Sequence, residues 1–251
     1  MNQKPAFRVS MPDKSPNSTL LIGVSTIGLS SLTAVDYLVK QHDSDPIGHI
    51  TTTNLPDITP FEEGKPRLPL RLYNLPDFEL TVLVGEMFIP VWAADPFVNA
   101  IVEWASSSEI EEITFLHGVP FSHGPDEHDV FYVASSSYRD RLTDTELKPL
   151  TGGYLDGVAG ELMTRTLTQS APPVGTLVTP THPPGPDFDA ALRFLEALEE
   201  NHGLTIEETE LQERAQEVQQ YYDELATRME QLHGGEQSLQ NRDFPEDRMF
   251  M

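Results

Sequence analysis

The sequence predicts an α/β protein with a three-layer α/β/α sandwich and a mostly parallel sheet, followed by a long C-terminal helix and a flexible tail. Short apolar runs that resemble buried strands recur up to residue 203, and helical segments separate them. A different, heptad-like pattern follows. Strands that alternate with helices favour a parallel sheet covered on both faces. We therefore expect an α/β domain at 1–203, an acidic heptad helix at 204–233 and a tail at 234–251.

The first half of the domain contains four apolar or β-rich runs and two helical segments. Strands are predicted at residues 19–24, 47–53, 70–72 and 80–84. The segment 29–40 is predicted to be an amphipathic helix with these side chains inward: Leu32, Val35, Leu38 and Val39. Asp95 as N-cap and Pro96 at the first helical position predict a helix over 95–107. The proline-rich segment 55–69 is expected to be a surface excursion.

The second half continues the alternation. Strands are predicted at residues 112–116, 130–134 and 175–179. A glycine-rich turn at 152–160 leads into a helix that ends near residue 169. Asp187 is a candidate N-cap for a helix that ends near residue 201.

After residue 203, apolar residues repeat at spacings of four and three: Leu211, Ala215, Val218, Tyr222, Leu225, Met229 and Leu232. This heptad spacing is typical of a coiled-coil seam, which would serve self-association. A long helix packed on its own domain explains the spacing equally well. Gly234-Gly235 ends the helix.

The chain ends in Met249-Phe250-Met251 after a polar stretch. Apolar side chains at the tip of a solvated tail have no core to enter, and a free carboxylate adds strong acceptor oxygens. One interpretation is a docking segment for another protein. The other is three apolar residues that end a tail by chance.

Charge narrows the classes of partner. Forty acidic residues and sixteen basic ones give a formal net charge of −24 over 251 residues. Nucleic acids and anionic membranes attract clustered Lys and Arg, which the chain lacks, so we predict neither as a partner. The acid excess, with few lysines, favours a protein from a salt-rich cytosol, such as that of a halophilic archaeon.

Other features point to the cytoplasm and away from cysteine chemistry. No apolar run reaches the ~18 residues of a membrane span, and residues 1–17 lack the basic-then-apolar order of a secretion signal. The chain has no cysteine, which excludes disulfides and thiolate sites. We therefore expect a cytoplasmic protein.

Two glycine loops could contact an anion. Gly23 and Gly28 lie between a strand and a helix, where α/β folds bind anions, but no lysine follows as in a phosphate-binding loop. The loop from Gly152 to Gly160 matches a dinucleotide-binding loop weakly. Tight turns and close helix–sheet packing are the favoured interpretation of both loops, with ligand binding as the alternative.

Three histidines and one glutamate are the remaining candidates for chemistry. His117, His123 and His128 are close in sequence and could hold a metal ion, but their spacing favours incidental members of an acidic loop. Glu86 follows a core strand and could be a buried carboxylate, although no partner is identifiable. We therefore predict no catalytic residue, no metal and no cofactor.

The order of several motifs resembles the archaeal branch of the proteasome assembly chaperone family, the homologues of proteasome assembly chaperone two. These motifs are the Gly23–Gly28 turn, Asp36-Tyr37-Leu38, the run 80–86, Phe115 to Pro120, the loop 152–160, the helix start at 186–191 and the acidic helix near Leu211. The resemblance covers nearly the whole chain. No single motif is specific.

The resemblance implies a fold similar to purine nucleoside phosphorylases and a non-enzymatic chaperone or activator role toward 20S proteasome α-subunits or their ring. It also implies a homo-oligomer, with a related paralogue as a further candidate subunit. The family's hydrophobic–tyrosine–any docking tag falls on Met249, Phe250 and Met251, where Phe250 lacks the tyrosine hydroxyl. The alternative function is a phosphorylase-like or hydrolase-like enzyme that uses the glycine turns as an anion site.

Overall fold

The computed structural model describes residues 6–11, 14–120, 124, 128–168, 171–182, 186–207 and 209–216. The chain divides into two units, Met1–Glu208 and Thr209–Met251. No helix in these described ranges is both long and apolar enough to cross a bilayer.

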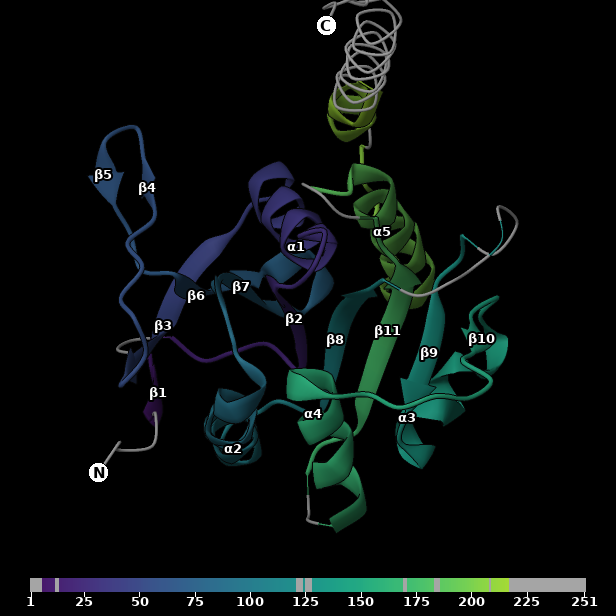
Figure 1. Cartoon of the computed structure of the whole chain (residues 1–251), viewed down its shortest axis with the longest axis horizontal. Coiled ribbons are helices and arrows are strands. Elements are labelled where there is room, and N and C mark those ends of the chain that lie inside the picture. The colour runs from purple at the N-terminus through teal and green to yellow at the C-terminus, as the bar shows by residue number, and fades with distance from the viewer. Residues whose placement is uncertain are drawn as a thin grey trace, which may run out of the picture. The chain divides into compact units, whose positions relative to one another are not determined.

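The first unit is built on a nine-stranded sheet of order β1-β3-β6-β7-β2-β8-β11-β9-β10 (Figure 1). In chain order its strands are β1 (Ala6–Ser10), β2 (Thr19–Ser25), β3 (Asp45–Thr53), β6 (Leu70–Leu75), β7 (Leu80–Phe88), β8 (Glu112–Val119), β9 (Phe131–Ala134), β10 (Lys148–Pro149) and β11 (Val174–Pro180). A separate small hairpin pairs β4 (Phe61–Glu62) with β5 (Lys65–Pro66).

The centre of the sheet is parallel and part of its periphery is antiparallel. Strands β7, β2, β8 and β11 run parallel to one another. Strands β1, β3, β6 and β7 pair antiparallel in that order, and so do β11 and β9. The step from β6 to β7 is the short turn Pro76–Phe78, and a connection this short can join only antiparallel neighbours.

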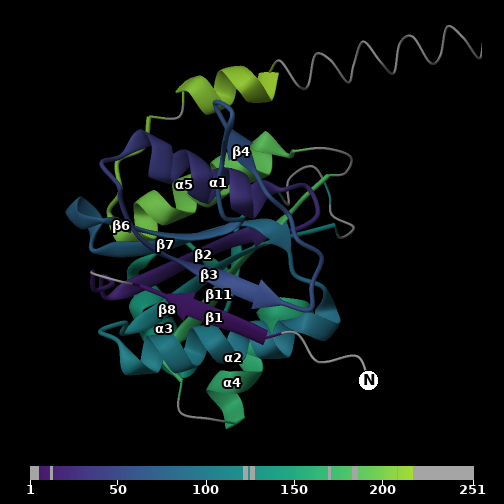
Figure 2. The ribbon, with the colours of Figure 1, turned by 90° about the vertical axis from the view of Figure 1, so that its left-hand side faces the viewer.

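Helices cover both faces of the sheet, which confirms the predicted three layers (Figure 2). Helices α1 (Ser30–Gln41) and α5 (Phe188–His202) pack together on one face. Helices α2 (Val91–Ser107) and α4 (Gly157–Thr168) pack together on the other face. The largest apolar core lies between the sheet and α2 with α4, and Leu20, Phe97 and Leu162 are among its fully buried members.

Several local predictions hold, and the start of α2 was predicted wrongly. Asp187 caps α5 by accepting a hydrogen bond from the Ala190 N–H at 2.9 Å. Helix α2 begins at Val91, so Pro96 lies inside it and Asp95 is no cap. Pro96 is tolerated because it is close to the start of the helix, where the carbonyl that loses its bond belongs to exposed Trp92. Asp95 instead pairs with Arg165 of α4.

Some elements gave no usable sequence signal, among them β1 and α3 (Ser136–Arg141). Helix α3 carries the fully buried Tyr138, whose hydroxyl contacts Thr114 at 2.6 Å and accepts from Asn201 of α5 at 3.2 Å. A Cβ at Gly175 would lie 2.2 Å from the Tyr138 ring, so that position on β11 has to be glycine. Burial raises the pKa of Tyr138 and keeps its proton in place.

In the second unit, residues 209–216 are helical. Leu211 and Ala215 of the predicted seam lie on this helix, where Arg214 and Glu210 form an ion pair at 2.7 Å. The other seam residues lie outside the described residues: Val218, Tyr222, Leu225, Met229 and Leu232. The predicted docking residues Met249, Phe250 and Met251 also lie outside them.

Candidate functional site

A cavity of about 600 Å³ lies at the carboxyl ends of the central strands. In open α/β sheets this edge is the usual place for a binding site. Loops after β2, β7 and β8 form part of the wall, and the segment that leads into α4 forms the rest. Most of its lining is apolar: Val24, Ile27, Phe88, Ile89, Val91, Phe115, Val119, Leu150, Leu155, Val158 and Val178. Its size is within the range of small-molecule and side-chain pockets.

Among the described residues, three titratable side chains line this apolar cavity: His117 on β8, the exposed Tyr154, and Asp156 just before α4. Burial lowers the pKa of His117 to about 4, although the charge of Asp156 acts in the opposite direction. The imidazole is therefore neutral at pH 7. Its Nδ1 atom is buried and has no hydrogen-bond partner among the described residues. A buried side-chain nitrogen without a hydrogen-bond partner is unusual, so His117 is a candidate binding residue.

The mouth of the cavity is surrounded by exposed apolar side chains. Ile27 is 50% exposed, Phe88 59%, Val91 63% and Tyr154 92%. All four line the cavity. Clustered exposed apolar groups on a soluble domain are typical of interaction surfaces. No sequence pattern indicated this rim because its residues come from three separate segments: the loop after β2, the junction of β7 with α2, and the loop before α4.

The two glycine loops differ in what surrounds them. A Cβ at Gly23 would lie 2.5 Å from the Ser31 carbonyl oxygen, which confirms close helix–sheet packing there. Gly28 has φ +74°, as expected of a tight turn. Gly152 and Gly153, in contrast, would place a Cβ in open space. The prediction of close packing is therefore wrong for these two glycines, which line the cavity instead.

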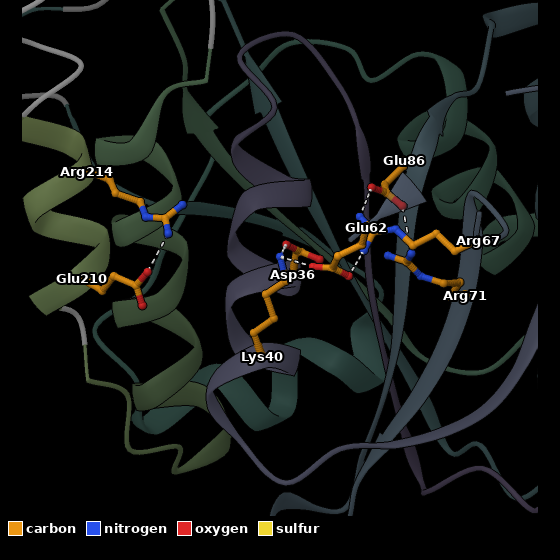
Figure 3. Close-up of polar contacts among 8 residues, drawn as sticks. All are labelled: Asp36, Lys40, Glu62, Arg67, Arg71, Glu86, Glu210 and Arg214. Atoms are coloured by element: carbon orange, nitrogen blue, oxygen red, sulfur yellow. Dashed lines mark hydrogen bonds and ion pairs between the residues drawn. The ribbon is translucent and has the colours of Figure 1, made fainter. Parts of the chain in front are cut away.

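Glu86 does have partners, although the sequence identified none (Figure 3). Its carboxylate pairs with Arg67 Nη2 at 2.7 Å and with Arg71 Nη1 at 3.0 Å. All three side chains are less than one quarter exposed. Burial acts to lower the pKa of Arg67, but the hydrogen bond and charge of Glu86, with the charges of Glu62 and Asp36, raise it above its usual value. Glu86 is therefore held in ion pairs with two arginines and does not line the cavity.

The two histidines of this group that the structure describes, His117 and His128, have different surroundings. His117 lines the cavity, and His123 lies outside the described residues. His128 contacts His182 at 3.4 Å, and the Nδ1 of His182 lies 3.0 Å from Asp187. Within the described part of the chain, no group of three or more His, Cys, Asp or Glu side chains could hold a metal ion.

The arrangement offers a pocket for an apolar group, and its lining includes one neutral imidazole, one carboxylate and one phenol. His117 and the glycine loop 152–160 were candidates in the sequence, but nothing there linked them. In the sequence, His117 follows a predicted strand, and the loop 152–160 precedes a predicted helix. Binding sites of α/β folds lie at such strand–helix connections, and this was the signal that could have linked the two.

Solved structures share this fold. PbaA from Pyrococcus furiosus, an archaeal homolog of proteasome-assembly chaperone, is 22% identical with a TM-score of 0.78, over 93% of this chain and 97% of that one. A protein of unknown function from Thermoplasma acidophilum is 24% identical, with a TM-score of 0.71 over 91% and 92% of the two chains. PbaB from Pyrococcus furiosus, an archaeal proteasome activator, is 17% identical, with a TM-score of 0.70 over 88% and 99%.

No curated protein matches the chain at a significant level. A protein-family model does match: the PAC2 family model covers residues 20–226. That range runs from β2 through α5 and into the second unit, and so includes the whole cavity wall. Because the match spans most of the chain, the protein belongs to the PAC2 family.

Proposed function

We propose that the protein is a proteasome assembly chaperone or activator-type adaptor that binds 20S proteasome α-subunits. The observation that carries the proposal is the PAC2 match over residues 20–226. The fold shared with PbaA and PbaB, which are described as a homolog of a proteasome-assembly chaperone and a proteasome activator, supports it. The proposal includes a cytoplasmic location and a homo-oligomer, with or without a paralogous subunit.

The proposed contact with the α-ring is the segment Met249-Phe250-Met251, and it rests on the sequence alone. Burial of one Phe and one Met side chain contributes roughly 1.5–3 kcal/mol each. A carboxylate paired with a lysine adds roughly 1.5–3 kcal/mol. Association costs about 4–15 kcal/mol, so one tail is marginal.

Several tails on one oligomer overcome this limit because linked sites raise the effective concentration to about millimolar. A flexible coil with as many residues as the stretch 233–248 would span about 20–24 Å. A linker of that reach would let the tails enter repeated pockets on a ring without strict symmetry matching. Self-association and tail docking are therefore parts of one mechanism.

The test is co-purification with the 20S particle at high salt. Phe250→Ala, and separately a few residues appended after Met251, should abolish co-purification. Met1 tagging without a change at the carboxyl end is the matched control and should leave it intact. Binding that survives both changes would refute the tail mechanism.

The cavity favours a second candidate, a phosphorylase-like or hydrolase-like enzyme. Its 600 Å³, the open Gly152-Gly153 loop and neutral His117 are suited to a small ligand. Glu86 is no longer a candidate for this chemistry because two arginines neutralise it. A thermal-shift screen with nucleosides, inorganic phosphate and divalent metals discriminates the candidates. A saturable shift that His117→Phe removes would favour the enzyme.

A further inference from the structure

Two histidines that are 54 residues apart in the chain meet at the carboxyl end of β11. His182 comes just after β11, and His128 comes just before β9, which pairs antiparallel with β11 (Figure 1). Because the two strands run in opposite directions, the start of β9 and the end of β11 lie at the same edge of the sheet. There the Nε2 atoms of the two rings are 3.4 Å apart.

The two imidazole rings face each other through these nitrogen atoms. Their centroids are 5.2 Å apart, farther than the Nε2 atoms, and the ring planes are tilted by 31°. A separation of 3.4 Å is long for a hydrogen bond, since an N–H donor usually lies about 2.7–3.2 Å from its acceptor. Two zinc–nitrogen bonds of about 2.0–2.1 Å, at the tetrahedral angle, place the nitrogens about 3.3–3.4 Å apart. The separation of the Nε2 atoms therefore matches one edge of a tetrahedral metal site.

Asp187 determines which ring nitrogen of His182 carries the proton. One carboxylate oxygen of Asp187 accepts from the His182 backbone N–H at 2.8 Å and lies 3.0 Å from the ring Nδ1. An ionised carboxylate only accepts hydrogen bonds, so Nδ1 carries the proton and Nε2 of the neutral ring presents its lone pair. A histidine that binds a metal usually donates its other ring N–H to a carboxylate in this way.

The Asp187 carboxylate is itself firmly held. Its side chain is only 7% exposed. Its other oxygen accepts from the Ala190 N–H at 2.9 Å, and its backbone N–H donates to the Gly28 carbonyl at 2.7 Å. The His182 side chain is 55% exposed, so a hydrated ion can reach the ring that this carboxylate orients.

Local charge also favours a cation. Arg193 donates to the Pro180 carbonyl at 2.8 Å, beside the histidine pair. Burial lowers the pKa of Arg193, and four carboxylates act to raise it: Asp187, Asp189, Glu196 and Asp129. One of them also pairs with Lys148, at 2.9 Å. Carboxylates outnumber these two cations, so the potential around the pair is negative.

We propose that His128 and His182 bind a zinc ion through their Nε2 atoms, with Asp187 as the positioning residue of His182. Water completes the tetrahedron, because the described part of the chain supplies no third ligand. Imidazole nitrogen suits zinc, whereas Mg²⁺ and Ca²⁺ prefer oxygen ligands. The ion joins the segment before β9 to the turn between β11 and α5, and so braces this edge of the sheet. The inference does not depend on proteasome binding.

Calorimetric titration with zinc chloride tests the site. The protein is first freed of metal with a chelator and then kept at high salt without chelator or phosphate. The full chain should bind zinc saturably. His128→Gln and His182→Gln, both at exposed positions, should each weaken zinc binding at least about tenfold. His49→Gln, on β3 near the opposite margin of the sheet, is the matched control and should leave binding unchanged.

Asp187→Asn tests the positioning role. Asparagine is as good an N-cap as aspartate, so α5 and the circular dichroism of the metal-free protein should be preserved. If the asparagine oxygen keeps the Ala190 hydrogen bond, its NH₂ group faces Nδ1 of His182 and favours the tautomer with the proton on Nε2. Zinc affinity should therefore fall about ten- to a hundredfold. Unchanged affinity would overturn the role of Asp187.

Two further results would overturn the site itself. One is zinc binding that neither histidine substitution weakens. The other is displacement of zinc by an excess of Mg²⁺, since a cation that prefers oxygen ligands would compete for acidic surface groups and not for a pair of imidazoles.

The thermal-shift screen separates this site from the cavity and from the tail. Zinc that binds the folded chain should raise its melting temperature, and His182→Gln should remove this shift. His117→Phe, which changes the cavity, and Phe250→Ala, which changes the tail, should both keep it. A zinc shift that His117→Phe removes and His182→Gln retains would place the ion in the cavity, and the proposal would be wrong.

Discussion

Glu86 and His117 lie near the ends of two strands that flank β2, and their surroundings are opposite. The carboxylate of Glu86 meets two guanidinium groups. The His117 ring is buried, neutral and leaves Nδ1 without a partner in the described part of the chain. Both oxygens of Glu86 face a guanidinium charge, although Oε2 makes no hydrogen bond with any residue that the structure describes. Nδ1 of His117 has neither an ion pair nor a hydrogen bond within the described ranges, and the ring lines a cavity. Position at a strand end therefore does not identify a site; a buried polar atom that lies beside a cavity without a compensating charge does.

The largest expected effect on stability is that of removing the Glu86 carboxylate. Glu86→Ala leaves mostly buried Arg71 without its carboxylate partner and leaves Arg67 with Glu62 alone. Loss of one partner from a buried ion pair costs about 3 kcal/mol or more. Denaturant unfolding should show this loss, and Glu111→Ala, at an exposed position, should change stability by less than about 0.5 kcal/mol. A loss below about 1 kcal/mol would mean that the cluster is effectively solvated.

Because of His117, the free energy of unfolding should depend on pH. Its pKa is about 4 in the folded protein and 6.5 in the unfolded chain, so the unfolded state binds more protons between these values. Stability is therefore fully present above about pH 6.5 and falls as the pH drops toward 4. At pH 5 this difference in pKa lowers the free energy of unfolding by about 2 kcal/mol relative to pH 7.

His117→Asn removes this contribution, so the variant should lose less stability than the parent protein between pH 7 and pH 5. His202, whose pKa is also lowered to about 4, by burial and by Arg141, remains in both proteins and serves as a common background. Parallel pH profiles of unfolding free energy would show that His117 is solvated in solution.

The two glycine loops allow a smaller test, which compares a tightly packed glycine with one that borders the cavity. Gly23→Ala should cost roughly 1–2 kcal/mol because its Cβ would meet the Ser31 carbonyl oxygen at 2.5 Å. Gly152→Ala has open space and should change stability by no more than about 0.5 kcal/mol. Thermal or denaturant unfolding of the two variants side by side measures the difference. Equal losses would contradict an open loop at the cavity.

The smallest expected effect concerns the hairpin turn. Glu63→Gly removes a side chain from a position with φ +49° and should stabilise the protein by about 1 kcal/mol or less. Glu79→Gly, at φ +52° after the Pro76–Phe78 turn, should have a similar effect, because it relieves the same backbone strain. Destabilisation by Glu63→Gly would indicate that its side chain makes contacts that outweigh the strain.

Local patterning was enough to predict much of the fold. Buried strands such as β2 and β7 are continuous apolar runs, and Asp187 is a good N-cap, so each was recognisable from neighbours in sequence. The antiparallel edge was not, because β1 is short and half-buried and its partner β3 is about forty residues away. Pro96 misled the prediction of α2 because proline is also tolerated inside the first turns of a helix.

The site was less predictable for a different reason. His117, Asp156 and Phe88 come together only after β7, β8 and α4 have been placed around β2. Glu86 was singled out because it follows a predicted core strand. Its arginine partners were not identified because they are 15 and 19 residues away, on another strand and in an irregular segment. Pairings between distant residues have no periodicity, so no sequence pattern reports them.

The last strand of the sheet in space, β10, consists of Lys148 and Pro149. Proline has no amide hydrogen, and a charged lysine resists burial, so a foreign strand cannot extend the ladder along this margin. Amyloid-like growth from the β10 side is thereby suppressed, which protects the protein when salt screens the repulsion between its negatively charged copies.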